Sequence, residues 1–279
     1  MKFYHKCKIK DFITQNWKDL VLVFITPMIL FLLFLLPLDI KEMLVLNRDY
    51  PKIYTIFTAN FIHEGFDHLK YNIINYILSI FLLYFSVSKI NKKYIFGRLL
   101  LVNLTLVPIS ISLIWMSVNK FIWTGVEKTL GFSGIVSSIN GAVVYSYIIF
   151  LNERVKINKL YATLSSISFS MFILILIYFE FYTRMLIGLI ISAIVVFIMA
   201  EKTLKTIDKK TEMKLIKNSK SSIKVRLYLP ILYVIVIFFS FQLFPKNFAQ
   251  GNVLTNFFIH YLGFIIGIAT FFVLNEKYK

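Results

Sequence analysis

Long apolar runs alternate with short polar connections along the chain. Eight runs contain no Asp, Glu, Lys or Arg, and most reach the roughly 20 residues that a helix needs to cross a bilayer. They cover residues 20–38, 71–88, 99–119, 129–152, 160–179, 185–200, 227–245 and 247–274. Because lipid cannot satisfy free backbone groups, such runs fold as helices. The pattern therefore predicts an all-α, polytopic membrane protein, a helical bundle with about eight transmembrane helices.

The connections between these runs set the expected domain organisation. One transmembrane domain carries short polar flanks, a basic loop and a helical hairpin. The expected boundaries are 1–19 for a basic cytoplasmic tail, 20–275 for the transmembrane domain, 160–200 for an extra hairpin, 201–226 for the basic loop and 276–279 for the C-terminus. The connection 39–70 mixes apolar and charged side chains, so we expect a partly helical element that lies on the membrane surface.

Charge gives the predicted bundle an orientation. The chain has 31 Lys and Arg against 14 Asp and Glu, a net charge of +17. If the N-terminus is cytoplasmic and the sides alternate, 23 of the 31 cations fall in cytoplasmic segments, as the positive-inside rule requires. We therefore expect both termini in the cytoplasm and the basic loop against the anionic lipid of the bilayer. This placement argues against a nucleic-acid partner.

Composition and spacing also limit metal chemistry. Cys7 is the only cysteine, which excludes an intramolecular disulfide and a thiolate metal cluster. The stretch FIHEGFDHLKYN, residues 61–72, has a glutamate after its first histidine, as in the zinc-protease pattern H-E-x-x-H. Here, however, His63 and His68 are five residues apart, which turns the second ring roughly 140° from the first on a helix. We expect no metal and no other cofactor.

Polar side chains gather at one depth of the predicted bundle. Once charge has assigned the sides, three helices that run inward carry polar residues near their outer ends. These residues are His68 and Asn72 in the second run, Thr129 to Gly134 at the start of the fourth, and His260 in the eighth. Ionisable side chains within membrane spans are costly and usually functional. The coincidence indicates a site just below the outer membrane surface.

Ser133 is the candidate nucleophile of this site. It lies between Gly131 and Gly134 at a predicted helix start, where glycine allows a sharp bend and the helix N–H groups are unpaired. Such N–H groups can stabilise a developing anion. For this residue alone, the alternative is a serine that packs between helices or bonds its own backbone.

His260 is the candidate general base. Gly263 and Gly267 follow it on the same helical face and would let another helix pack backbone to backbone. The fourth run offers a matching face of small residues, namely Ser133, Ser137 and Gly141. If these faces meet, the imidazole reaches the serine hydroxyl. Otherwise His260 is hydrogen-bonded across helices without chemistry.

His68 and Asn72 are the candidate oxyanion-hole residues. They are four apart and share a helical face, and both can donate hydrogen bonds to a carbonyl oxygen as it gains negative charge. His63 lies off this face, before the helix, and we expect it to anchor the 39–70 connection. Asp67 is expected to be the helix N-cap. A polar helix start without a catalytic role is the alternative.

Together these motifs resemble the rhomboid family of intramembrane serine proteases. The matching patterns are His63-x4-His68-x3-Asn72, Gly131-x-Ser133-Gly134 and His260-x2-Gly263-x3-Gly267. The resemblance implies that Ser133 is the nucleophile and His260 its general base, in a dyad without an acid. It further implies that His68, Asn72 and the Ser133 amide form the oxyanion hole, and that the remaining motif residues have structural roles.

The resemblance also implies an activity. We expect a serine endopeptidase of the plasma membrane that cleaves single-pass or polytopic membrane proteins within transmembrane segments. Its site would open to the extracytoplasmic side. The alternative is an inactive rhomboid-like protein that binds membrane proteins without cutting them. A metal-dependent protease or transporter using His63, His68 and His260 is a third possibility, and the five-residue histidine spacing argues against it.

Three features depart from the family pattern, and the first is that the acidic residue often seen after the second span is absent from residues 87–98. Rhomboids commonly have six core spans, whereas this chain has eight predicted spans, three of them between the Ser133 and His260 helices. Three is odd, so both helices keep the same direction, and the 160–200 hairpin would be an insertion. Many bacterial members have a tyrosine one turn after the serine that stacks on the histidine. Here Ser137 takes that position, and Tyr261 or an aromatic residue of span seven is a candidate to hold His260 instead.

Overall fold

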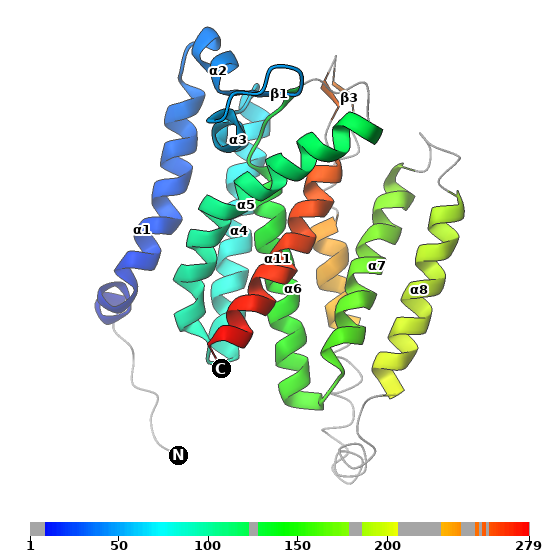
Figure 1. The fold of residues 1–279 in the computed structure, drawn as a ribbon. Coiled ribbons are helices and arrows are strands. Elements are labelled where there is room, and N and C mark those ends of the chain that lie inside the picture. Colours follow the sequence, from blue (N-terminus) through cyan, green and yellow to red (C-terminus); the bar gives the residue numbers. More distant parts are fainter. Residues whose placement is uncertain are drawn as a thin grey trace.

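The described chain is mostly helical (Figure 1). The computed structural model describes residues 9–122, 128–178, 186–205, 230–240, 249–250, 253–254 and 257–278. Within these ranges, four helices are long and apolar enough to cross a membrane. They are α4 (Phe66–Lys89), α5 (Lys93–Ile122), α6 (Ser133–Val155) and α11 (Phe257–Lys277).

Further helices surround these four. Each of the eight predicted apolar runs contains a helix, so the helical character of the chain is confirmed. The others are α1 (Ile9–Phe34), α2 (Leu38–Leu44), α3 (Thr55–Thr58), the 3-10 helix η1 (Ala59–Phe61), α7 (Lys159–Tyr178), α8 (Leu186–Lys205) and a helix over Pro230–Ser240.

Two short antiparallel strand pairs were not predicted. The first joins β1 (Leu46–Asn47) to β2 (Lys128–Thr129), and the second joins β3 (Ala249–Gln250) to β4 (Val253–Leu254). Each strand has two residues, too few to produce an alternating hydrophobic pattern in the sequence. The fold is therefore all-α, with two local strand pairs in its connections.

Helix α6 lies at the centre of the bundle. In its apolar window, 89% of the residues are buried, against 33–44% in α4, α5 and α11. It contacts α4, α5, α7 and, most extensively, α11. A helix that is buried on all sides needs small residues to admit its neighbours, and α6 is correspondingly rich in serine and glycine.

Glycines bring α6 and α11 into backbone contact. A Cβ atom at Gly263 would collide with the Gly134 carbonyl, one at Gly267 with the Ser138 carbonyl, and one at Gly141 with the Phe264 carbonyl. The predicted meeting of two small-residue faces is thus confirmed. On α6, however, Gly134 and Ser138 take part beside Gly141, because the α11 glycines pack against backbone carbonyls rather than against the serine hydroxyls.

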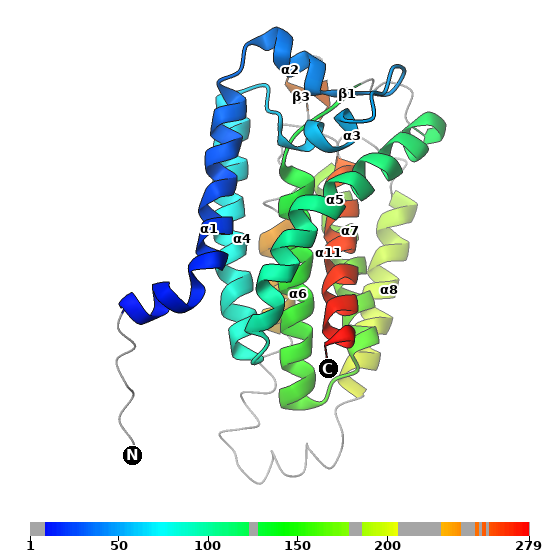
Figure 2. The same ribbon diagram turned by 60° about the vertical axis from the view of Figure 1, so that its left-hand side comes forward.

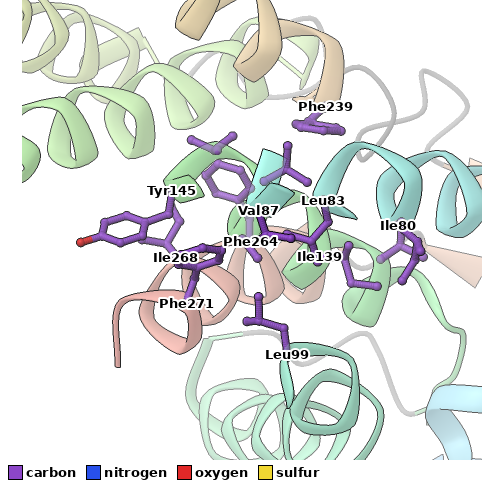
Figure 3. Close-up of a cluster of buried hydrophobic side chains, with 14 of the residues drawn as sticks. Ile80, Leu83, Val87, Leu99, Ile139, Tyr145, Phe239, Phe264, Ile268 and Phe271 are labelled. Carbon is purple, nitrogen blue, oxygen red and sulfur yellow. The ribbon is translucent and has the colours of Figure 1, made fainter. Parts of the chain in front are cut away.

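The main hydrophobic core fills the space around α6 (Figure 3). Side chains of α4, α5, α6, α11 and the Pro230–Ser240 helix converge there. The labelled members are Ile80, Leu83, Val87, Leu99, Ile139, Tyr145, Phe239, Phe264, Ile268 and Phe271. This packing holds the helix carrying Ser133 and the helix carrying His260 in one apolar cluster.

Helices α7 and α8 pack against each other, so the predicted hairpin pairing over 160–200 is confirmed for the described residues. Its connecting residues lie outside the described ranges, as does most of the basic loop 201–226. Hydrogen bonds tie α7 to the Pro230–Ser240 helix: the Ser165 and Tyr233 hydroxyls are 2.5 Å apart, and the Ser170 and Ser240 hydroxyls 3.3 Å.

The 39–70 connection is partly helical, as predicted, and covers one end of the bundle (Figure 2). It is fixed by a second apolar cluster that joins it to α5 and to the start of α11: Leu46, Ala59, Val107, Ile111, Trp115 and Ile259. The buried Asn60 amide adds a hydrogen bond of 2.9 Å to Ser112 Oγ on α5. Helices α6 and α11 both begin beneath this cover.

Candidate active site

Ser133 and His260 meet where their two helices begin. Ser133 is the first residue of α6, and His260 lies in the first turn of α11. Although 127 residues separate them in sequence, Ser133 Oγ is 2.7 Å from His260 Nε2. The histidine is buried and the serine is half-buried. The predicted proximity of hydroxyl and imidazole is confirmed, and a neutral Nε2 can accept the serine proton.

Three contacts fix the turn that precedes α6. The strand pairing of β2 with β1 holds its first residues. The Gly131 N–H donates to the Ala59 carbonyl at 3.0 Å. The Phe132 ring then packs between Phe61 and Tyr76, with ring centres 5.7 and 5.4 Å away. The start of α6 is therefore held by the 39–70 connection and by α4.

Both the backbone conformation and the crowding by neighbouring atoms require glycine at position 131. Its φ of +114° is one that side-chain-bearing residues rarely adopt. A Cβ atom here would also lie 2.9 Å from His68 Cε1 and 3.2 Å from His68 Nε2, while 4.0 Å from Ser133 Oγ. The glycine thus leaves room for the His68 ring, which packs against the turn that carries Ser133.

Gly134 has a comparable role toward α11. A Cβ atom there would lie 2.8 Å from Ile259 and 3.0 Å from Ile111. Ile259 directly precedes His260 in the chain. Any side chain at position 134 would therefore displace the Ile259 side chain, which packs next to the imidazole-bearing residue on α11.

Asn72 joins the site through His63. The Asn72 Nδ2 atom is 3.0 Å from His63 Nε2, and both side chains are buried. The His63 ring also meets the His68 ring edge-on, with 4.9 Å between centres. His63 was expected only to anchor the loop; it also contacts both predicted oxyanion-hole residues. Its nine-residue separation from Asn72 follows no helical period, so the sequence carries no signal for this bond.

Burial, together with the neighbouring His68, lowers the pKa of His63 to about 3. The ring is therefore neutral at physiological pH, and Nε2 accepts a hydrogen bond from the Asn72 amide while Nδ1 carries the ring proton. An amide nitrogen has two N–H groups. Fixing one of them on His63 determines the direction of the other.

One prediction about a neighbouring residue is wrong. Helix α4 begins at Phe66, with Gly65 as its N-cap and no side-chain cap bond. Asp67 therefore lies in the first turn, where a carboxylate interacts favourably with the helix dipole, rather than at the cap. The Tyr261 hydroxyl donates to the Ile167 carbonyl of α7 at 3.3 Å; that Tyr261 holds His260 stays a prediction.

The Ser137 hydroxyl bonds within its own helix rather than to His260. It donates to the Ser133 carbonyl at 2.7 Å, one turn back along α6. The position that a tyrosine occupies in many rhomboids is therefore used for a bond within the helix. Close backbone packing at Gly263 and the side-chain packing of Ile259 fix the α11 backbone around His260 instead.

Among the residues that the structure describes, no group of three or more His, Cys, Asp or Glu side chains is placed to hold a metal ion. Comparisons with protein-family models, with curated proteins and with solved structures give no match to this chain. Its function must therefore be argued from the geometry of its own site.

Proposed function

We propose that this protein is an intramembrane serine endopeptidase of the rhomboid type, which hydrolyses peptide bonds in the transmembrane segments of other membrane proteins. The observation that carries the proposal is the 2.7 Å hydrogen bond between Ser133 Oγ and His260 Nε2. Several other serines in these helices, such as Ser79 and Ser137, bond the carbonyl four residues back. Ser133 pairs with an imidazole from another helix, which argues against a purely local role.

The reaction would follow the general course of serine hydrolases. His260 Nε2 accepts the Ser133 proton as Oγ attacks the substrate carbonyl, and it then donates this proton to the departing amine. The acyl group left on Ser133 is released by a water molecule, whose proton His260 accepts in turn. The serine recovers its hydroxyl hydrogen when the ester bond breaks.

The oxyanion of each tetrahedral intermediate needs hydrogen-bond donors. The Ser133 N–H belongs to the first turn of α6, whose N–H groups have no carbonyl partner within the helix. The His68 ring beside Gly131 and the amide of Asn72 would be the other donors. In this mechanism His63 does not touch the substrate; it orients Asn72.

We further propose that the chain crosses the plasma membrane eight times with both termini in the cytoplasm, so that the site opens to the extracytoplasmic side. Two observations support this topology. Helices α6 and α11 begin at the same end of the bundle (Figure 1), as an odd number of spans between them requires. The opposite end carries the cation-rich helix ends, in line with the positive-inside rule.

The test is cleavage of a transmembrane substrate by purified, reconstituted protein. Ser133→Ala and His260→Ala should each lower turnover by several orders of magnitude. Ser138→Ala is a matched control, because this buried serine on the same helix has no hydrogen-bond partner for its hydroxyl among the described residues. Its turnover should match that of wild type.

A fluorophosphonate probe separates the protease from the alternative, a binding factor without activity. The probe should label wild type and Ser138→Ala but not Ser133→Ala. Wild type that neither cleaves nor reacts would favour the binding factor. Cleavage that persists in Ser133→Ala but stops with a strong chelator would favour a metal-dependent reaction.

A further inference from the structure

At the end of the bundle away from Ser133, basic side chains lie over aromatic rings. The described residues include six such contacts, with 4.0–5.7 Å between cation and ring centre. They are Lys89–Phe85, Lys93–Tyr84, Arg98–Tyr278, Lys277–Tyr278, Arg154–Phe150 and Lys202–Tyr161. A ring attracts a cation through its quadrupole without cancelling the charge. These contacts orient the basic side chains, and the rings do not cancel their charge.

Carboxylates neutralise little of this charge. An ion pair at this end joins Lys159 Nζ to Glu276 at 3.5 Å. Glu153, Glu201 and Glu276 also lie at this end, but Lys and Arg outnumber them. At the other end, acidic and basic residues are about equal in number. The acidic residues there are Asp39, Glu42, Asp49, Glu64 and Asp67. The two ends therefore differ in net charge as well as in position.

Hydrogen bonds hold several of these basic residues together in one cluster at the edge of the bundle, which we call the rim. Lys92 Nζ donates to Asn275 Oδ1 at 2.5 Å, and the Tyr94 hydroxyl donates to the Tyr278 carbonyl at 2.8 Å. Arg98 stacks on the Tyr278 ring at 4.0 Å. These contacts hold the connection between α4 and α5 against the last turn of α11 (Figure 1). Cations from three helix ends share this rim.

We propose that this rim, formed by Lys89, Lys92, Lys93, Arg98 and Lys277, binds the phosphate groups of anionic phospholipids. The four cations other than Lys92 are exposed. Exposed apolar side chains lie one helical turn toward the middle of the bundle, such as Phe85 before Lys89 and Val273 before Lys277. Phosphate groups would meet the cations while acyl chains contact this apolar border. A soluble phosphate compound would use only the cations.

The test compares lipids at the protein surface and needs no enzymatic activity, so its failure is distinct from failure of the proposed function. The full chain is reconstituted in phosphatidylcholine vesicles with spin-labelled phosphatidylglycerol or spin-labelled phosphatidylcholine. Electron paramagnetic resonance then gives the ratio of the two association constants. A cation near an anionic surface contributes roughly fivefold, so wild type should prefer phosphatidylglycerol by at least about fivefold. High salt should reduce the ratio toward one.

The variant Lys89→Gln/Lys93→Gln/Lys277→Gln should lose most of this preference. Lys41→Gln/Lys52→Gln is the matched control, because both lysines also lie over rings, at 4.4 and 6.0 Å, but at the Ser133 end. It should keep the wild-type ratio. Equal association of both lipids with wild type would overturn the proposal even if the triple variant failed to fold. So would an unchanged ratio in a folded triple variant, or displacement of the lipid by millimolar inorganic phosphate.

Discussion

At the scale of single residues, His63 connects the predicted oxyanion-hole side chains. It is 1% exposed, so it cannot reach a substrate from its position. Its contacts are the Asn72 amide at 3.0 Å and the His68 ring. A neutral imidazole that accepts one amide N–H fixes the rotamer of Asn72, which an unaided amide at a helix start would not maintain. We therefore assign His63 a positioning role.

This role predicts different outcomes for two substitutions. His63→Leu removes the acceptor of the Asn72 amide and should lower kcat by about 10- to 100-fold, with little change in KM. The loss should not exceed that caused by removing an oxyanion-hole donor itself. His63→Gln retains an acceptor oxygen and should recover part of kcat. Reconstituted cleavage assays beside melting temperatures in detergent would measure both. If kcat falls equally in the two variants and follows melting temperature, His63 serves packing alone.

The same residue makes stability depend on pH. The pKa of His63 is about 3 in the folded protein, against an ordinary value of 6.5. Between these values the unfolded chain binds a proton that the folded chain does not, so lowering the pH below 6.5 reduces the free energy of unfolding. The slope from this group is at most about 1.4 kcal/mol per pH unit. Above pH 6.5 its contribution is constant.

Thermal unfolding in detergent at pH 7.5, 6.5 and 5.5 would measure this slope, in a range where most carboxylates do not titrate. The His63→Gln protein should lose less stability than wild type between pH 6.5 and 5.5. Equal pH slopes for the two proteins would show that His63 is not the group responsible.

At the scale of elements, the sequence predicts most of the helices but not how the start of α6 is held. Each apolar run contains a helix, and the glycine spacing around His260 correctly predicted close packing against α6. The pairing of Leu46 with Thr129 and the bond of Gly131 to Ala59 were not predicted. Both are backbone contacts, which depend on three-dimensional proximity and leave no side-chain pattern in the sequence.

Helix α6 also contains a polar residue that its surroundings do not satisfy. Asn140 is fully buried, and neither atom of its amide group has a hydrogen-bond partner among the described residues. Leaving a buried polar group unsatisfied costs about 1–3 kcal/mol. Asn140→Leu should therefore raise the free energy of unfolding by about 1–2 kcal/mol, provided that leucine, which has the same branching as asparagine but is bulkier, fits the space.

Asn60→Leu is the matched comparison for Asn140→Leu. The Asn60 amide is also buried, but it donates to Ser112 Oγ at 2.9 Å and lies 3.3 Å from the Pro108 carbonyl. Its replacement should lower the free energy of unfolding, by about 1–3 kcal/mol. Chemical unfolding in mixed micelles would measure both. A destabilised Asn140→Leu protein would indicate that a bound water or another partner satisfies the Asn140 amide.

At the scale of the whole molecule, charge and chemistry lie at opposite ends of the bundle. The Ser133 and His260 pair is at the end covered by the 39–70 connection, and the ring-bound cations are at the other (Figure 2). Cations at one set of helix ends favour the cytoplasmic side. The distribution of charge therefore predicts that the site faces out of the cell, even though nothing in the chemistry of the dyad requires it.

Single-cysteine labelling tests this orientation. In a Cys7→Ser background, Tyr50→Cys places a thiol on the 39–70 connection, where Tyr50 is 82% exposed. Glu153→Cys places one at the exposed last turn of α6. A membrane-impermeant maleimide should label the first variant in intact cells and the second only after permeabilisation. The reverse labelling pattern would put the Ser133 hydroxyl at the cytoplasmic face. There it would meet the inner ends of its substrates, so the same dyad would give a different set of cleavage products.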